Sequence, residues 1–250
     1  MGLGLVLIGS MPNCGKSVRI ESGKQVCAVI DPGHGGSDPG AVYHQQSEKD
    51  VTLTYAHALA ARVRDRMGDG QVILTRKTDT FVSLNWRREV ADIYQAELLV
   101  SLHADASSDA DVVGTRIYYP RFHPQPTPVT TMTELLDELE RYDHSAQSRL
   151  IGHAMAQNLR TSVPRDVQVR AARFFLLDEA RRPTLLVELG YLSSLVDQEM
   201  LEDPQILGRF VDGMAEAIIS ACSDGRGEID AYGKSTDLIS NGGLIGDRAP

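Results

Sequence analysis

The sequence predicts an α/β fold, a single-domain Rossmann-like mixed sheet flanked by helices on both faces. The main observation is that short apolar, strand-like runs alternate with helix-periodic segments from about residue 24 to residue 222. Composition agrees, because the 250 residues are 42% hydrophobic and 24% charged, enough for one sizeable core. The net charge of -9 argues against nucleic acid and anionic lipid as partners. No apolar run reaches the roughly eighteen residues of a transmembrane segment.

The first half of the chain contains the clearest elements. The residues Val51, Tyr55, Leu59 and Val63 form one apolar stripe, which predicts a helix over residues 48–67. Its expected N-cap is Ser47, and glycines 68 and 70 end it. The other elements expected here are strands at 25–30, 71–76, 98–104 and 114–119 and a helix at 84–95.

The second half begins with a proline-rich loop over residues 120–133. A short acidic amphipathic helix is expected at 134–140, and a longer helix is expected to end near Ser162. Strands are expected at 174–177 and 184–189, and a closing helix at 204–221.

These elements divide the chain into one α/β domain and two extensions. Residues 1–23 form an N-terminal extension, either a signal remnant or residues added to the protein, and residues 223–250 form a flexible tail. Residues 24–222 form the domain, with a Pro-rich and acidic insertion at about 120–145. The extension contains SMPNCGKS, which nearly matches a phosphate-binding loop, but its first glycine is one residue out of register. The three widely spaced cysteines (14, 27 and 222) indicate neither a disulfide framework nor a cysteine zinc site.

The most informative segment is residues 29–42, VIDPGHGGSDPGAV. A β-branched run ends abruptly in a glycine-rich loop that carries His34, and such a loop places its side chains at the edge of the sheet. The loop is either a tight turn with an incidental histidine or a backbone bent to present the imidazole to a ligand.

His103 occupies a matching place at the end of another strand, LLVSLHA. If the two strands are neighbours, both imidazoles meet at one sheet edge, where Glu48 begins a helix. Two imidazoles and a carboxylate with an open position for water are the ligand set of a catalytic zinc site. Without zinc, Glu48 would still favour a helix start and His103 could be a hydrogen-bonded core residue. There is no local HExxH motif.

Glu188 ends a continuous apolar strand, and a buried unpaired carboxylate is costly. Two roles remain open for it. It could form a salt bridge to Arg181 or Arg182, or it could act as a general base beside a metal-bound water, with a pKa raised by burial.

Together, five motifs in order make the chain resemble the zinc-dependent N-acetylmuramoyl-L-alanine amidases of bacterial cell walls, amidase type 3. The resemblance covers about residues 25–221. The matching segments are IDPGHGGSDPGA (30–41), SEKDV (47–51), VILTRKTDTFVSLNWR (72–87), LLVSLHADA (98–106) and FFLLDEARRPTLLVELGYLSS (174–194).

The resemblance implies that His34, Glu48 and His103 bind Zn²⁺ and that Glu188 is the catalytic general base. It also implies hydrolysis of the amide between N-acetylmuramic acid and L-alanine in peptidoglycan, in the periplasm or cell envelope. The resemblance connects this activity with cell-wall degradation, remodelling or daughter-cell separation. The alternative is a non-catalytic amidase-fold protein that binds peptidoglycan or a partner.

Two departures from the family pattern matter. Asp105 stands where the family usually has asparagine, which alters charge near the site but leaves the ligands intact. The insertion at 120–145 is shorter than the one that plugs the active site in related division amidases. Its acidic segment at 134–140 is expected to form a partial lid or a surface on which a protein activator docks, or else a solvated surface helix.

Overall fold

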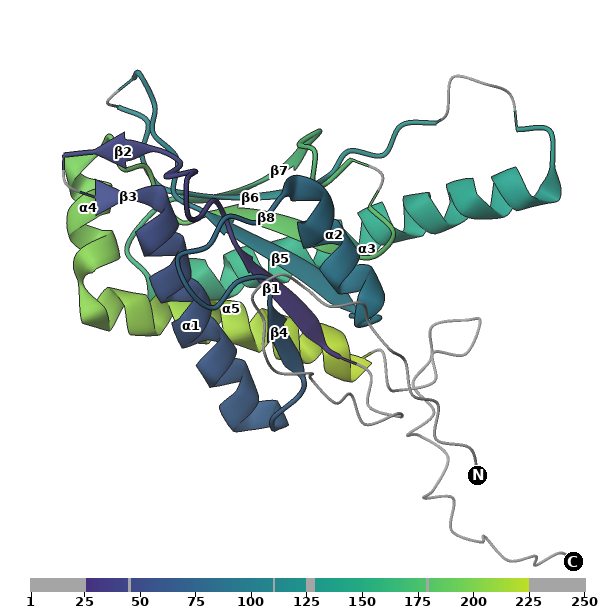
Figure 1. Cartoon of the computed structure of the whole chain (residues 1–250), viewed down its shortest axis with the longest axis horizontal. Helices are drawn as coiled ribbons and strands as arrows, with labels where there is room; N and C mark the ends of the chain where they lie inside the picture. Colours follow the sequence, from purple (N-terminus) through teal and green to yellow (C-terminus); the bar gives the residue numbers. More distant parts are fainter. Residues whose placement is uncertain (1–25, 45, 110, 125–128, 179, 225–250) are drawn as a thin grey trace, which may run out of the picture.

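The computed structural model of the protein describes residues 26–44, 46–109, 111–124, 129–178 and 180–224 (Figure 1). The predictions for residues 1–23, including the phosphate-loop-like segment, and for the tail from residue 225 lie outside the described residues. The division of the chain at residues 23 and 222 stays a prediction. Within the described residues, no helix is both long and apolar enough to cross a membrane.

The described strands form a six-stranded mixed sheet in the order β4-β1-β5-β8-β6-β7. The first four are mutually parallel, β6 runs antiparallel to β8, and β7 pairs parallel with β6. Their bounds are β1 Ala28–Pro32, β4 Val72–Leu74, β5 Leu98–His103, β6 Thr115–Pro120, β7 Val167–Ala172 and β8 Thr184–Glu188. The short strands β2 (Val42–Tyr43) and β3 (Gln46–Ser47) form a separate hairpin. The predicted α/β fold class is confirmed.

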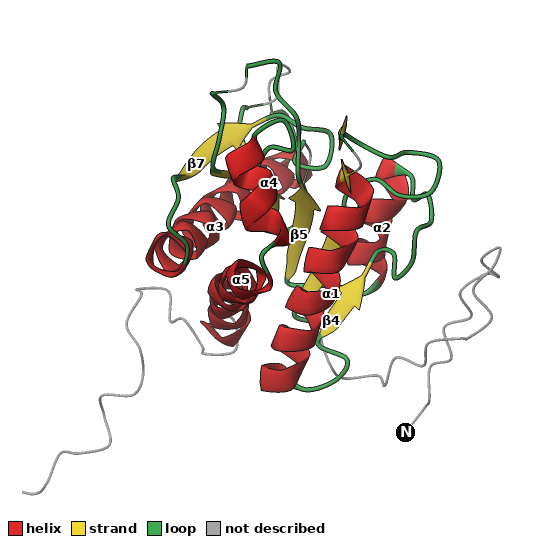
Figure 2. Ribbon diagram, turned by 90° about the vertical axis from the view of Figure 1, so that its left-hand side faces the viewer, coloured by secondary structure: helices red, strands yellow, loops and turns green. Residues whose placement is uncertain are grey.

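Helices cover both faces of this sheet and build two cores. The described helices are α1 Glu48–Met67, α2 Leu84–Ile93, α3 Met132–Ser162, α4 Leu195–Glu202 and α5 Pro204–Asp224. Figure 2 shows α5 lying between α1 and α3. The larger core lies under these three helices and takes alternate strand residues such as Ile30 and Val100. The smaller core lies under α2 and takes the intervening Val29 and Leu99. Strands buried on both faces explain the continuous apolar runs in the sequence.

The strand order places a topological switch point between β1 and β5. From β1 the chain passes through α1 to β4 on one side, and then through α2 to β5 on the other side of β1. Open α/β sheets bind ligands in the crevice at the carboxyl ends of the strands where the order reverses. The ends of β1 and β5, and of β8 beside them, are therefore the expected location of a site.

Three segments on either side of β8 differ from the sequence prediction. Residues 174–177 are not a strand but part of a turn, in which the backbone N–H groups of Leu177 and Asp178 both donate to the carbonyl of Phe174. The aromatic run suggested a strand, but the chain has to reverse here, because β7 and β8 run in opposite directions. The half-exposed edge strand β7 and the short helix α4 were not predicted.

The insertion also differs, because residues 132–162 form one continuous helix rather than two. Thr131 and Glu134 form a capping box that starts α3. Ser145 Oγ donates to the carbonyl of Pro120, at the end of β6 farthest from Glu188. The turns before Ser145 therefore extend past the amino ends of β1, β5 and β8. They project from the rest of the fold (Figure 1). In this position they do not form the expected lid.

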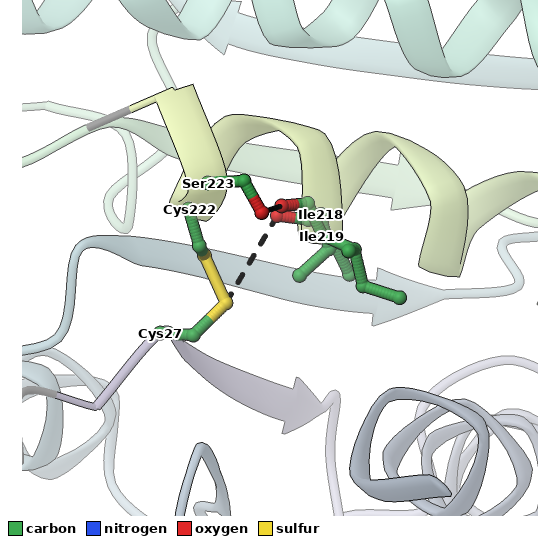
Figure 3. The surroundings of a disulfide bond; sticks show 5 residues. All are labelled: Cys27, Ile218, Ile219, Cys222 and Ser223. Atoms are coloured by element: carbon green, nitrogen blue, oxygen red, sulfur yellow. Dashed lines mark hydrogen bonds between the residues drawn. A yellow bond between two sulfur atoms is a disulfide. The ribbon is translucent and has the colours of Figure 1, made fainter. Parts of the chain in front are cut away.

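The cysteine spacing indicated no disulfide framework, but the described residues contain a disulfide. Cys27, just before β1, is bonded to Cys222 in the last turn of α5, across a sequence separation of 195 (Figure 3). Both cysteines are fully buried. Cys27 Sγ also lies 3.9 Å from the carbonyl oxygen of Ile218, a simple contact because a disulfide sulfur carries no hydrogen. The sequence offered no local signal, because only the fold brings the first strand beside the last helix.

Candidate metal centre

The three predicted ligands converge at the switch point. His34 follows β1, His103 is the last residue of β5, and Glu48 is the first residue of α1. One potential ligand atom from each residue lies within 4.8 Å of the other two. Because β1 and β5 are hydrogen-bonded neighbours, both imidazoles reach the same sheet edge, as the sequence argument required.

The Glu48 carboxylate lies between the two imidazoles. Its Oε2 is 3.1 Å from His34 Nε2, and its Oε1 is 2.9 Å from His103 Nδ1. The backbone N–H groups of Ala41 and Ala104 donate to the same two oxygens, at 2.8 Å and 3.1 Å respectively. These contacts fix a carboxylate that is only 3% exposed. Two nitrogens and a carboxylate oxygen form a donor set suited to zinc, and the residues present fit that ion.

Asp38 is a partner that the sequence argument missed. Its Oδ2 lies 2.9 Å from His34 Nδ1, while its Oδ1 accepts a hydrogen bond from the Gly40 N–H. A carboxylate on one ring nitrogen sets the tautomer, so the opposite nitrogen, Nε2, is the one free to bind a metal. Only the spacing of four residues from His34 within the glycine loop could have suggested this role.

The electrostatics of the cluster favour charge on all three residues. Burial opposes protonation of His34, but hydrogen bonds and charges from Glu48 and Asp38 outweigh it and raise the pKa of His34 to about 9. The pKa of His103 is also raised, because the Glu48 hydrogen bond and the nearby carboxylates overcome its burial. Both imidazoles in turn lower the pKa of Glu48 in spite of burial. A divalent cation would take the place of these imidazole protons and satisfy the same carboxylate.

Two glycines leave the room that the cluster needs. A Cβ on Gly33 would lie 2.5 Å from the His103 ring, and a Cβ on Gly40 would lie 2.5 Å from Glu48 Oε2 and 2.6 Å from the His34 ring. His34 itself has a φ of 59°, an unusual value for a residue with a side chain. The glycine-rich loop thus bends the backbone and also lets the ligands approach one another.

We expect Gly40→Ala to lower zinc affinity about 10- to 100-fold, because the new methyl group displaces Glu48 and His34 together. A competition titration against a chromophoric chelator measures the affinity. Gly208→Ala is the matched control, because a Cβ at that position in α5 meets nothing within 4 Å. Equal zinc affinity for the Gly40 variant and the wild type would contradict this expectation.

Two buried arginines hold the backbone of the histidine loop. The guanidinium of Arg87 donates to the carbonyls of Pro32 and His34, both at 2.7 Å, and pairs with the fully buried Asp31 at 2.6 Å. Arg76 donates to the carbonyls of Pro32 and Gly33. Both arginines lie in the family-like segment at residues 72–87, but the sequence assigned neither of them a contact. The arginines satisfy carbonyl groups that the irregular loop leaves without strand partners.

Glu188 lies beside the cluster at the end of β8. It pairs in register with His103, is 8% exposed, and accepts a hydrogen bond from the Asp105 N–H at 3.1 Å. Burial raises the pKa of Glu188 to about 7, and the charges of Glu48 and Asp105 act in the same direction while His103 opposes them. Such a group can accept and return a proton near neutral pH.

The alternative role for Glu188, a salt bridge to the arginines before β8, does not fit the structure. Arg181 and Arg182 precede the strand, at its opposite end, about 20 Å away along an extended chain. Arg182 pairs instead with Asp92 and donates to the carbonyl of Ala96.

An open cavity of about 720 Å³ connects all four predicted residues. Its floor includes Asp31, Arg87 and Ser101, and its mouth includes Asp38 and Asp105. Apolar side chains from two distant segments, residues 81–84 and 174–176, line its sides. The sequence analysis did not assign these apolar residues to the site.

The mixed α/β sheet places a His-Glu-His cluster that could hold a metal ion at its switch point, beside an open cavity, an arrangement that fits a metal-dependent hydrolase. The chain belongs to the Amidase_3 family, N-acetylmuramoyl-L-alanine amidase, whose model matches residues 28–220.

Individual relatives agree with this assignment at low identity. The sporulation-specific N-acetylmuramoyl-L-alanine amidase of Bacillus subtilis is 29% identical over 193 residues, which are 77% of this chain and 66% of the relative. The N-acetylmuramoyl-L-alanine amidase LytC of the same organism is 29% identical over 79% of this chain, which spans only 36% of LytC. Among solved structures, the catalytic domain of the amidase CwlV from Bacillus (Paenibacillus) polymyxa var. colistinus has a TM-score of 0.65 and 28% identity, covering 78% of this chain and 97% of that domain.

Proposed function

We propose that the protein is a zinc-dependent amidase that hydrolyses the bond between N-acetylmuramic acid and L-alanine in peptidoglycan. The observation that carries this proposal is the convergence of His34, Glu48 and His103 on one point, with Glu188 lining the same cavity. Membership of the amidase family supplies the substrate class.

The four side chains divide the chemistry between them. His34, Glu48 and His103 would hold the zinc ion, which would polarise the amide carbonyl and acidify a water molecule. Glu188 accepts the proton of the attacking water on its carboxylate and returns it to the leaving alanine nitrogen. Its hydrogen bond from the Asp105 N–H keeps the carboxylate directed towards the cluster.

We also propose that the protein works in the periplasm or cell envelope, in wall remodelling or daughter-cell separation. The buried Cys27–Cys222 disulfide supports an oxidising compartment. The competing function, peptidoglycan binding without turnover, is disfavoured because all three ligand positions and Glu188 are present.

The deciding measurement is digestion of purified peptidoglycan with and without a chelator, followed by mass analysis of the products. We expect release of intact stem peptides that carry a free alanine amino group, abolished by the chelator and restored by added zinc. Cleavage within the peptide or the glycan would contradict the proposed bond, and full activity of chelated, metal-free protein would contradict the proposed cofactor.

We further propose that the projecting start of α3 is a docking site for a protein activator. Five apolar side chains are exposed there, Met132, Leu135, Leu136, Leu139 and Tyr142. Five acidic residues lie among them, Glu134, Asp137, Glu138, Glu140 and Asp143. This combination fits a partner with an apolar groove bordered by lysine and arginine.

Deletion of residues 124–140 tests the docking site. We expect basal wall hydrolysis to stay within about twofold, because the start of α3 projects past the amino ends of β1, β5 and β8, away from His34, Glu48 and His103. Stimulation of hydrolysis by an extract of envelope proteins should be lost. Stimulation that survives the deletion would contradict the docking site.

A further inference from the structure

Three exposed phenylalanines stand at the mouth of the cavity. Phe81 is 58% exposed, Phe174 42% and Phe175 47%. All three line the cavity that also contains the three candidate metal ligands. Phe81 belongs to the segment before α2, whereas the other two belong to the turn before β8. Exposed apolar side chains that gather around a concave site mark a ligand-binding surface.

The segment before α2 that carries Phe81 is held against the histidine loop by hydrogen bonds and an ion pair. Lys49 Nζ donates to the carbonyl of Gly36 at 3.0 Å and pairs with Asp79 at 2.7 Å. Asp79 in turn accepts a hydrogen bond from the Gly36 N–H, at 2.7 Å. Gly36 packs so closely that a Cβ would lie 2.5 Å from the backbone nitrogen of Phe81. Phe81 is therefore held in a fixed position relative to His34, although its side chain faces solvent.

The opposite wall is held by aromatic and cationic contacts. The Phe174 ring packs edge-on against Tyr118 of β6, with 5.0 Å between ring centroids and an interplanar angle of 89°. The guanidinium of Arg88 lies over the ring of Phe175, 5.4 Å from its centroid. Two backbone hydrogen bonds to the Phe174 carbonyl close the turn. Contacts of this kind order side chains that would otherwise be mobile, and they reduce the entropy lost when a ligand binds.

We propose that Phe81 and Phe174 form a saccharide subsite, in which a pyranose ring of the glycan strand packs its C–H face on an aromatic ring. This inference rests on the proposed function and adds to it, because it makes the sugar a determinant of substrate recognition. Aromatic rings supply large apolar surfaces of fixed geometry, which suit the apolar face of a pyranose. The half-exposed Asp38 and the exposed Asp105 at the mouth provide acceptors for sugar hydroxyl groups.

The absence of charged side chains on the two apolar sides of the cavity favours a sugar there over the charged stem peptide. Residues 81, 82, 84 and 174–176 carry no ionisable side chain. Asp105 is exposed in the lining of the same cavity and disfavours an anionic peptide carboxylate close to it. A neutral N-acetylated sugar carries no such penalty.

The test compares two substrates that share the scissile amide and the peptide, a disaccharide peptide (N-acetylglucosaminyl-N-acetylmuramyl peptide) and a D-lactyl peptide without sugar. We expect Phe81→Ala and Phe174→Ala each to raise KM for the disaccharide peptide about tenfold, equivalent to about 1.4 kcal/mol, with kcat within about threefold. KM for the D-lactyl peptide should not change. Phe81→Trp should retain the lower KM, because it preserves an aromatic face.

Phe122→Ala is the matched control, because Phe122 packs edge-on against Tyr142 beyond the far end of β6 and does not line the cavity. Calorimetric titration with a neutral peptide-free disaccharide, N,N′-diacetylchitobiose, measures binding independently of turnover, and we expect both alanine variants to weaken it about tenfold. An equal KM increase for both substrates, or unchanged disaccharide binding by folded variants, would overturn the saccharide subsite. Wild-type protein that binds the disaccharide but cleaves neither substrate would overturn the proposed function and leave the subsite standing.

Discussion

Glu188→Gln lowers kcat/KM on peptidoglycan by a factor of about 10² to 10⁴ while zinc binding stays near one ion per chain; this is the expected result if Glu188 is the general base. Glutamine has the same shape and can still accept the hydrogen bond from the Asp105 N–H, but it cannot take a proton from water. The variant should fold, since it replaces a largely buried carboxylate that burial already disfavours in its charged form.

Three measurements separate catalysis from structure. Release of stem peptides gives the rate, elemental analysis gives the zinc content, and thermal unfolding gives stability. Glu202→Gln, at the exposed end of α4, is the matched control and should behave like the wild type. A Glu188→Gln variant that retains zinc and cleaves at more than about a tenth of the wild-type rate would exclude Glu188 as the principal proton acceptor.

Cys27→Ala combined with Cys222→Ala is expected to lower the free energy of unfolding by about 3 to 5 kcal/mol. The bond joins residues separated by 195 positions, so it removes much of the conformational freedom of the unfolded chain. The chain-entropy relation gives about 5 kcal/mol for such a loop, and removal of a native disulfide in general costs about 2 to 5 kcal/mol.

Urea denaturation of oxidised and reduced protein measures this effect. Reduced wild-type protein should match the double variant, and Cys14→Ala should match the oxidised wild type. A difference below about 1 kcal/mol between the oxidised wild type and the double variant would contradict the expected stabilisation.

The central strands could be predicted because their sequences permit little else. β1 (AVIDP), β5 (LLVSLH) and β8 (TLLVE) are buried on both faces and are therefore mostly apolar, and each has a polar or charged residue at or near its carboxyl end. The edge strand β7 lacks this signature, since its residues are mostly half-exposed and only one neighbour pairs with it. For residues 174–177, a strand was predicted that the structure does not contain. Their aromatic side chains favour a strand locally, yet they serve the cavity wall.

The candidate site was likewise predictable only in part. Residues that end strands or begin helices could be assigned to one sheet edge, and His34, Glu48, His103 and Glu188 do meet there. Contacts between separate loops could not be read from the sequence. The backbone support by Arg87 crosses 53 positions to His34, and the aromatic walls come from segments about 90 residues apart. Such contacts depend on tertiary packing that no local pattern encodes.

The disulfide also determines how mechanical load would pass through the protein. Cys27 immediately precedes the strand that leads to His34, and Cys222 lies in the last described helix, with their Cα atoms 5.5 Å apart. Tension applied between the two ends of the described fold would be carried by one covalent bridge rather than by the hydrogen bonds of the sheet. The disulfide lies at the start of β1, whereas His34, Glu48 and His103 lie beyond the carboxyl end of that strand. Pulling on the two ends would therefore leave the ligand geometry unloaded, which would suit the proposed action on a polymeric substrate.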